Sequence, residues 1–377
     1  MYGSARTEIP LSRNPGLDVL RGLSGLLVVL HHLALRIPLG KTALADFVPR
    51  RVLGALSYNG YEAVFVFFVI SGFLIANHCI VRWGGLADID LRAFYARRAG
   101  RIVPCLLLVL AALSAMHLAG VTHFVIDKPE QSLPRALFAA LLLHLNWYEG
   151  ATGYLPGGWD VLWSLSIEEA FYLGFPLLCA LVRSRALLSL LLVALVCSIP
   201  FSLMAITDNE IWKEKAYLPG MGAIAAGVLV ALAVRQWPQP PRVLLAFVRG
   251  FGVAGLLAIA LAMRELWPLL HDFVMFWHVV CAACLVYALA HSRRAGMRGL
   301  AWLRSMGRYS YEIYLGHMFV VFAVVAAFNS GGADLRRGWL WYVPAVLACW
   351  ALGALVGRLY SEPCARALTQ RLARRAT

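Results

Sequence analysis

The sequence predicts an all-α membrane protein, a polytopic helix bundle of about ten transmembrane helices with one further re-entrant segment. Of the 377 residues, 61% are hydrophobic and only 14% are charged, and the mean hydropathy is +0.71. These values lie outside the range of soluble globular domains. The composition therefore excludes a receptor ectodomain, a soluble dinucleotide-binding enzyme and a nucleic-acid-binding domain, and it predicts a single integral-membrane domain over residues 1–377.

Eleven apolar runs are candidates for the spans, because a transmembrane helix needs about 20 mostly apolar residues. They fall at roughly 17–38, 60–81, 102–121, 136–148, 163–182, 186–205, 216–234, 248–263, 271–290, 309–329 and 339–359.

The distribution of basic residues favours ten crossings over eleven. With ten crossings, 21 Lys and Arg residues lie on one side of the membrane and 10 on the other, and the positive-inside rule makes the richer side cytoplasmic. Both termini are then cytoplasmic. The segment that fails to cross is expected within 136–182, where the first run is short and the second contains Glu168 and Glu169. Which of the two runs is re-entrant stays open, since either needs a protein-enclosed environment.

The net charge of +14 fits loop arginines that set orientation and contact anionic lipid, so the lipid bilayer is an expected partner and nucleic acid is not. Cys281 and Cys284 have the spacing of metal ligands, but they stand in an apolar helical run without a second pair, which favours packing. We expect neither a disulfide framework nor a metal site. The cysteines inside apolar stretches, where this side chain packs well, are Cys79, Cys105, Cys179, Cys197, Cys281, Cys284 and Cys349.

Ionisable residues inside a span are costly and mark candidate functional sites. In the first span, Arg21 and His32 are 11 residues apart, which places them about 20° apart on one helix face and roughly 16 Å apart along the axis. His31 is rotated by about 80° from that line. Arg21 near the cytoplasmic surface and His32 deep in the membrane would suit a long ligand with an anionic head and a reactive tail. The alternative is a lipid-binding arginine and a hydrogen-bonded packing histidine.

Two further arginines follow the second span, which contains the small residues Ser71 and Gly72 that let helices approach closely. Arg98 and Arg101 share a helix face at i, i+3 spacing. Such a pair can clamp phosphates through charge-assisted hydrogen bonds. The alternative for this cluster, taken alone, is that its arginines only hold the loop at the cytoplasmic face of the membrane.

Two later segments add polar groups at membrane depth. Glu168 and Glu169 head an apolar run, where Glu168 is expected either to orient His32 or to pair with an arginine. The alternative is that both carboxylates only stabilise the start of a helix, where acidic side chains are favoured. In the penultimate span, polar side chains at 310, 314 and 317 lie within about 60° of one another on a helix. A polar stripe of this kind usually faces a cavity or another helix.

Together and in this order, these segments resemble the acyltransferase 3 family, bacterial integral-membrane enzymes that acylate O-antigen, exopolysaccharide, Nod factor, peptidoglycan and macrolides. The resemblance extends from residue 17 to about residue 363. The matching pieces are Arg21-x10-His32 after Leu17-Asp18, Phe67 to Ile75, Arg97 to Pro104, Trp163 to Tyr172, Ser310 to His317 and, more weakly, Glu362-Pro363.

The resemblance implies transfer of an acyl group, usually acetyl, from cytoplasmic acyl-coenzyme A to a sugar hydroxyl at the outer side of the bacterial inner membrane. Arg21, Arg98 and Arg101 would hold the coenzyme phosphates, while His32 would deprotonate the acceptor hydroxyl with Glu168 as its orienting group. A covalent acyl group on His32 is an open alternative.

The remaining expectations concern the path and the acceptor. Ser310, Tyr314 and His317 would line the path of the acceptor or of the pantetheine arm, and no metal is required. An exopolysaccharide or O-antigen sugar is the first expectation for the acceptor, and a macrolide or another secondary metabolite is the second. The chain is expected to end in a short basic cytoplasmic tail without an appended esterase-like domain.

A transporter of lipid-linked sugar is the alternative from another functional class. In transporters, intramembrane Arg, His and Glu residues form substrate or proton pathways. The sequence contains no detectable inverted repeat, and its one adjacent pair of intramembrane acidic residues, Glu168 and Glu169, stands in a single segment. Both observations favour the enzyme.

Overall fold

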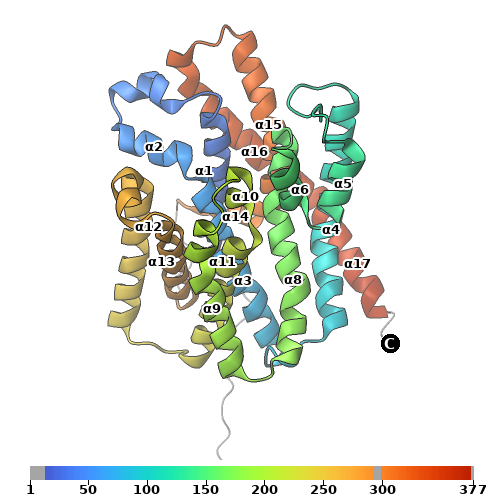
Figure 1. The fold of residues 1–377 in the computed structure, drawn as a ribbon, viewed down its shortest axis with the longest axis vertical. Coiled ribbons are helices and arrows are strands. Elements are labelled where there is room, and N and C mark those ends of the chain that lie inside the picture. The colour runs from blue at the N-terminus through green and yellow to red at the C-terminus, as the bar shows by residue number, and fades with distance from the viewer. Residues whose placement is uncertain (1–12, 293–298, 375–377) are drawn as a thin grey trace, which may run out of the picture.

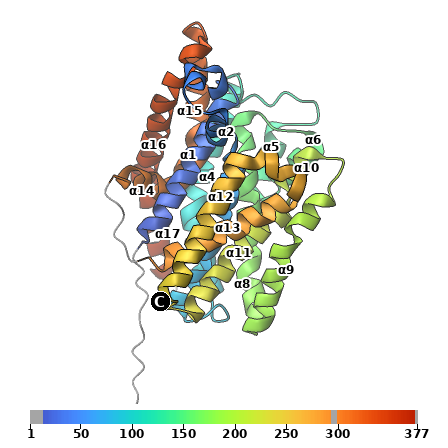
Figure 2. The same ribbon diagram turned by 90° about the vertical axis from the view of Figure 1, so that its left-hand side faces the viewer.

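The computed structural model describes residues 13–292 and 299–374, and within these ranges the chain forms helices and no strand. Ten helical segments in this part of the chain are long and apolar enough to cross a membrane, which confirms the predicted polytopic bundle. In Figure 2, α1 (Pro15–Ala34) rises from the lower end of the bundle, and the last helix, α17 (Glu362–Arg374), ends at that same lower end. This arrangement agrees with an even number of crossings. Residues 375–377 of the predicted basic tail lie outside the described ranges.

The candidate spans after α1 follow in chain order, and three of the connections between spans contain helices of their own (Figure 1). They are α3 (Gly60–Trp83), α4 (Leu91–Leu118), α7 with α8 (Gly157–Asp160, Trp163–Leu181), α9 (Arg185–Met204), α10 with α11 (Glu210–Lys215, Tyr217–Gln236), α12 (Arg242–Leu270), α13 (Phe273–Ala290), α15 (Ser310–Ser330), and η3, α16 and η4 (Leu335–Trp341, Tyr342–Val356, Gly357–Ser361) continuing into α17. The connecting helices are η1 (Leu39–Lys41), η2 (Ala43–Asp46), α2 (Arg50–Tyr58), α5 (Leu133–Leu141), α6 (Leu145–Thr152) and α14 (Ala301–Arg308).

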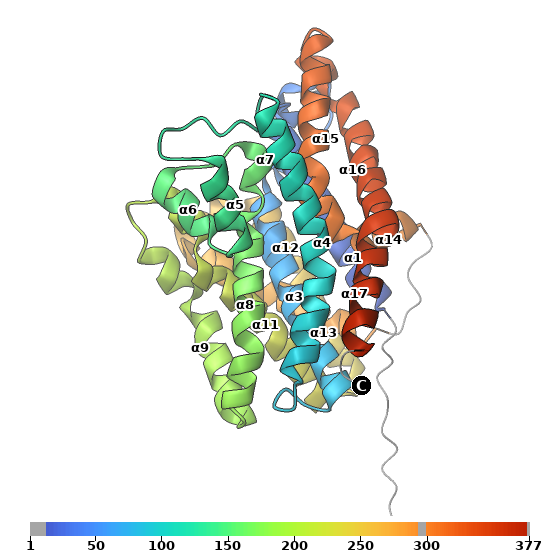
Figure 3. The same cartoon turned by 90° about the vertical axis from the view of Figure 1, so that its right-hand side faces the viewer.

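The run 136–148 is the one that does not cross. It is divided between α5 and α6, of 9 and 8 residues, which are too short to span a bilayer. Between them, Leu143 adopts a φ of 62°, a left-handed conformation that non-glycine residues rarely take. The Tyr217 hydroxyl donates a hydrogen bond to the Leu143 carbonyl oxygen at 2.6 Å and holds this turn. Figure 3 shows both short helices beside the upper part of α8, which makes the crossing instead.

Local sequence explains where α1 begins and where α3 ends. The Asn14 side chain accepts hydrogen bonds from the first backbone amides of α1, and Pro15 occupies the first helical position, the two residue types favoured there. At the other end of α3, Gly84 has a φ of 82° and stops the helix. The cytoplasmic connection predicted from the charge pattern therefore begins at a defined helix terminus.

Glycines allow the central helices to pack closely. A Cβ atom at Gly72 of α3 would overlap the backbone of Ile224 on α11, and one at Gly227 would overlap the backbone of α3 in return. The same relation joins α1 to α14, where Gly22 and Gly307 each face the partner backbone. Small residues at such crossings are typical of membrane helix pairs. The contact of α1 with α14 positions the start of α15 beside α1.

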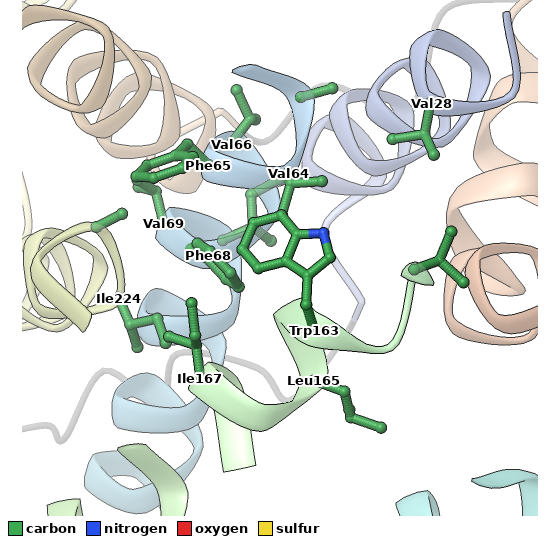
Figure 4. Packing of buried hydrophobic residues seen from close by; sticks show 14 of the residues in the cluster. Val28, Val64, Phe65, Val66, Phe68, Val69, Trp163, Leu165, Ile167 and Ile224 are labelled. Carbon is green, nitrogen blue, oxygen red and sulfur yellow. The ribbon is translucent and has the colours of Figure 1, made fainter. Parts of the chain in front are cut away.

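An apolar core lies where α3, α8 and α11 meet. Figure 4 shows Trp163 and Ile167 of α8 pointing toward Phe68 of α3 and Ile224 of α11. The rings of Phe68 and Trp163 meet edge to face with centroids 6.4 Å apart, a favourable aromatic geometry. This packing fixes the start of α8, and so the polar residues Ser164 and Glu168 that follow on the same helix.

Candidate active site

A cavity of about 510 Å³ lies among α1, α3, α4, α8 and α15. At one end it is bounded by the beginning of α1, the end of α3 and the beginning of α4, and at the other end it stops at Ser164 and Tyr314. Six of the residues selected from sequence line this cavity: Arg21, Arg98, Arg101, Glu168, Ser310 and Tyr314. The structure thus brings together residues that are up to 293 positions apart in the chain.

One end of the cavity is strongly basic. Arg21, Arg97, Arg98 and Arg101 all line it, and within the described residues none of these four forms an ion pair. The Arg98 guanidinium instead lies 4.7 Å from the centroid of the Tyr172 ring. Guanidinium groups without an ion-pair partner are free to make charge-assisted hydrogen bonds to an anionic ligand.

Arg13, which the sequence reasoning did not select, also lines the basic end but is neutralised. Its Nε donates hydrogen bonds to both carboxylate oxygens of Asp18, at 2.9 and 2.7 Å. Because this pair cancels its own charge, the positive charge available to a ligand comes from α1 at Arg21 and from the first turns of α4.

Glu168 lies on the cavity wall and not against His32. Its carboxylate accepts a hydrogen bond from the Tyr172 hydroxyl at 2.9 Å, and it is close enough to Arg21 to interact electrostatically. No hydrogen bond joins Glu168 to His32, both of which are described residues. The expected orienting contact is therefore absent, because the start of α8 directs Glu168 toward the arginines. The alternative named from sequence, an ion pair between Glu168 and an arginine, is not formed among the described residues either, because the hydrogen-bond partner of Glu168 is Tyr172.

Two hydroxyl groups close the inner end of the cavity. The Tyr314 hydroxyl lies 3.0 Å from the Val161 carbonyl oxygen and 2.7 Å from Ser164 Oγ. Because a carbonyl oxygen can only accept, the single Tyr314 proton goes to Val161, and Ser164 donates to Tyr314. This small network separates the cavity from the next turn of α15, on which His317 lies. Ser310 is buried on the cavity wall one turn earlier.

Three histidines stand in a row behind this barrier. The His32 ring lies 5.2 Å from that of His31 and 5.1 Å from that of His317, measured between centroids. His31 Nδ1 lies 3.0 Å from the Ser57 carbonyl oxygen, which identifies His31 as a packing residue. His317 is fully buried and is not among the residues that line the cavity. The structure thus places it behind the cavity wall on which we expected it. His32, half-buried, is the member with no hydrogen bond to its ring among the described residues.

A buried ion network near the histidines escaped the sequence reasoning. Lys215 Nζ lies 2.8 Å from Glu149 Oε2 and also contacts Asp160, and the Lys215 and Glu149 side chains are both 0% exposed. Burial, together with the neighbouring Asp160, raises the pKa of Glu149 well above its usual range, while the Lys215 charge opposes that rise. The signal available in the sequence was a lysine at the start of a long apolar run, which needs a buried partner.

The bundle and its cavity define a class: a multi-pass helical membrane protein with a cavity that is basic at one end and has a row of histidines beyond its other end. Comparison with known proteins identifies the family. The chain belongs to the acyltransferase 3 family, whose acyltransferase domain matches residues 14–358. It is therefore an acyltransferase that transfers groups other than amino-acyl groups.

Curated relatives agree with this assignment. The chain is 29% identical to acyltransferase MdmB of Streptomyces mycarofaciens, over 95% of this chain and 93% of MdmB. It is 24% identical to peptidoglycan O-acetyltransferase OatA of Listeria monocytogenes, over 81% of this chain and 49% of OatA. It is 30% identical to O-acetyltransferase OatA of Staphylococcus aureus (strain NCTC 8325 / PS 47), over 45% of this chain and 25% of that protein. No solved structure matches the chain.

Proposed function

We propose that this protein transfers an acyl group, with acetyl as the expected group, from cytoplasmic acyl-coenzyme A to a sugar hydroxyl at the outer side of the bacterial inner membrane. The observation that supports this most is the cavity of about 510 Å³ with unpaired arginines at one end and the Tyr314 barrier, backed by His32 and His317, at the other. Its basic end coincides with the side of the bundle to which the charge pattern assigns the cytoplasm.

In this proposal the donor binds in the cavity with its phosphates at the basic end. Arg21, Arg98 and Arg101 come from two helices and surround that end, and guanidinium groups bind phosphate through paired hydrogen bonds. The pantetheine arm would then extend along α1 toward His32. The helical offset of roughly 16 Å between Arg21 and His32 is comparable with the length of that arm.

The chemistry assigned to His32 is general-base catalysis. Neutral His32 takes the proton of the acceptor hydroxyl as its oxygen attacks the thioester carbonyl carbon. A carbon–oxygen bond forms, the carbon–sulfur bond breaks, and the departing thiolate receives the proton from His32. The free ring of His32 supports this role, since a base must change its protonation state during each turnover.

A glycan is the acceptor that we propose. The Listeria relative is named a peptidoglycan O-acetyltransferase. An esterified sugar hydroxyl outside the cytoplasm agrees with a base that lies beyond the inner end of a cavity whose basic end is on the cytoplasmic side. Within this class, an exopolysaccharide or O-antigen sugar is the proposed acceptor for this chain.

The test uses inside-out membrane vesicles. They are prepared from cells of the bacterium that encodes this protein, after deletion of its native gene, and each preparation expresses one variant. Radiolabelled acetyl-coenzyme A is added, and both free coenzyme A and label in a product other than coenzyme A are measured. Wild type should release coenzyme A and transfer label, and His32→Ala should do neither. Right-side-out vesicles should be inactive, because the basic end of the cavity then faces the lumen.

The arginine site is tested in the same vesicles. Arg98→Gln should raise the KM for acetyl-coenzyme A about tenfold or more, the effect of losing one charge-assisted contact of about 1.5–3 kcal/mol. Arg185→Gln is the matched control, since it removes the same charge from an exposed position outside the cavity on the same side. Vesicles that move a lipid-linked sugar across the membrane while releasing no coenzyme A would replace the proposal with the transporter.

A further inference from the structure

The surroundings of His317 fix the proton on its ring. His317 Nδ1 lies 2.6 Å from the Tyr314 carbonyl oxygen. Because a carbonyl only accepts, Nδ1 must have the proton, and in the neutral ring Nε2 is then an acceptor. This Nε2 atom is buried and has no hydrogen-bond partner among the described residues. A buried polar atom without a partner costs free energy and needs an explanation.

His32 is the polar side chain placed to explain it. The two ring centroids are 5.1 Å apart with the ring planes at 44°. No hydrogen bond fixes the tautomer of His32. Glu168, the carboxylate expected to orient this histidine, is hydrogen-bonded to Tyr172 on the cavity wall. The catalytic histidine therefore lacks a carboxylate partner at the place where His317 presents an unused acceptor.

We infer that His317 is the positioning residue for His32: the two ring centroids already lie 5.1 Å apart, and a small rotation of the His32 ring lets one of its nitrogens donate a hydrogen bond to the unpartnered His317 Nε2. The other nitrogen of His32 is then left with the lone pair that takes the proton of the acceptor hydroxyl. This inference rests on the proposed function. It assigns to a neutral imidazole, locked by the Tyr314 carbonyl, the task that a carboxylate performs when it selects the tautomer of a catalytic histidine.

The proton balance of the step is simple. The hydroxyl proton moves to the free nitrogen of His32 as the carbon–oxygen bond forms, and His32 becomes an imidazolium whose other N–H is still bonded to His317 Nε2. The thiolate that leaves then takes one proton from His32, which returns to its starting tautomer. His317 keeps its Nδ1 proton on the Tyr314 carbonyl throughout, so it neither gains nor loses a proton over the cycle.

Another histidine offers a matched control. His278 on α13 is also buried, its Nε2 lies 2.9 Å from the Glu62 carbonyl oxygen, and its Nδ1 has no partner among the described residues. It thus shares with His317 the burial, the carbonyl bond and the unpartnered nitrogen. It makes no ring contact with His32. If the loss of kcat came only from removing a buried histidine side chain, it should appear in the variants of both His317 and His278.

The experiment compares His317→Leu, His317→Gln and His278→Leu in the vesicle assay with radiolabelled acetyl-coenzyme A. His317→Leu should lower kcat for label transfer about 100-fold or more, the scale at which an orienting partner of a catalytic histidine acts, with the KM for acetyl-coenzyme A unchanged. His317→Gln, whose amide oxygen accepts a hydrogen bond, should recover at least about tenfold of that loss. His278→Leu should keep kcat within about threefold of wild type.

Folding is monitored by size-exclusion chromatography of each variant in detergent. Equal losses of kcat in His317→Leu and His278→Leu, or a kcat in His317→Leu close to wild type, would overturn the inference. A kcat for His317→Gln that is no higher than the kcat for His317→Leu would also overturn it. The proposed function fails in a different way, since wild-type vesicles would then release no coenzyme A at all.

Discussion

Removing the buried cation of the Lys215 network should strongly destabilise the protein. In Lys215→Met, Glu149 loses a partner 2.8 Å away and Asp160 loses its own ion pair. The side-chain exposures are 0% for Lys215, 0% for Glu149 and 22% for Asp160. Two carboxylates would remain next to each other with little water to solvate them. Breaking a buried ion pair from one side typically costs about 3–5 kcal/mol.

Two comparisons separate this effect from the loss of any ion pair. The Arg51 and Glu265 side chains are paired but 69% and 48% exposed, so Arg51→Met should cost less than about 1 kcal/mol. Replacing all three members of the network by apolar residues of similar size removes the unpaired charges along with the cation. That triple variant should recover most of the stability lost in Lys215→Met, because apolar substitutes for a complete buried ion network are often neutral.

The assay is equilibrium unfolding of the purified protein in mixed micelles, followed by tryptophan fluorescence at fixed detergent composition. The expected order of unfolding free energies is wild type and Arg51→Met at the top, the triple variant close to them, and Lys215→Met lowest. A Lys215→Met protein within about 1 kcal/mol of wild type would show that Lys215 is not needed to compensate the buried carboxylates. A triple variant less stable than the single one would show that the network acts through something other than charge compensation.

Three further predictions follow from other parts of the structure. Gly72→Ala should lower the unfolding free energy by about 1–3 kcal/mol, since its new Cβ overlaps the Ile224 backbone. Tyr314→Phe should raise coenzyme A release without transfer by about 30-fold, because the two lost hydrogen bonds, each of about 1 kcal/mol, together favour an open barrier. Burial and the Arg36 charge lower the pKa of His123, so stability should fall as the pH drops below about 6.5, where the unfolded chain binds the proton more readily.

Each of these predictions has its own control. Gly54→Ala adds a Cβ with nothing within 4 Å, and a cost equal to that of Gly72→Ala would contradict close packing of α3 on α11. A constant ratio of coenzyme A released to label transferred in Tyr314→Phe would show that the hydroxyl does not close the cavity. The acid-dependent loss of stability should shrink in His123→Gln, and an unchanged pH profile of thermal unfolding would assign it to other groups.

Sequence periodicity and charge were sufficient for the architecture. The number of spans followed from the asymmetry of Arg and Lys, and the structure shows ten candidate spans. The identity of the non-crossing run within 136–182 did not follow, because hydropathy alone does not distinguish one short run from one with internal carboxylates. The turn at Leu143 and its hydrogen bond from Tyr217 decide it, and both depend on contacts between distant segments.

The candidate site was predictable where it rests on helix geometry. The spacing of Arg98 and Arg101 placed both on the cavity wall, and Arg21 lies there as well. The partner of Glu168 was not predictable in the same way, because it depends on how α8 is rotated about its axis. The Lys215 network joins α6, α7 and the end of α10, and no local pattern announces a contact among three separate segments.

The most direct test of His32-dependent acyl transfer is mass spectrometry of surface glycans and secreted metabolites from cells that express wild type or His32→Ala. We expect glycans with an added acetyl mass in wild-type cells alone. An acetyl group found instead on a macrolide or another secreted metabolite would contradict the proposed acceptor while preserving the reaction. Identical glycans and metabolites in both cell lines would contradict an acyl transfer that depends on His32.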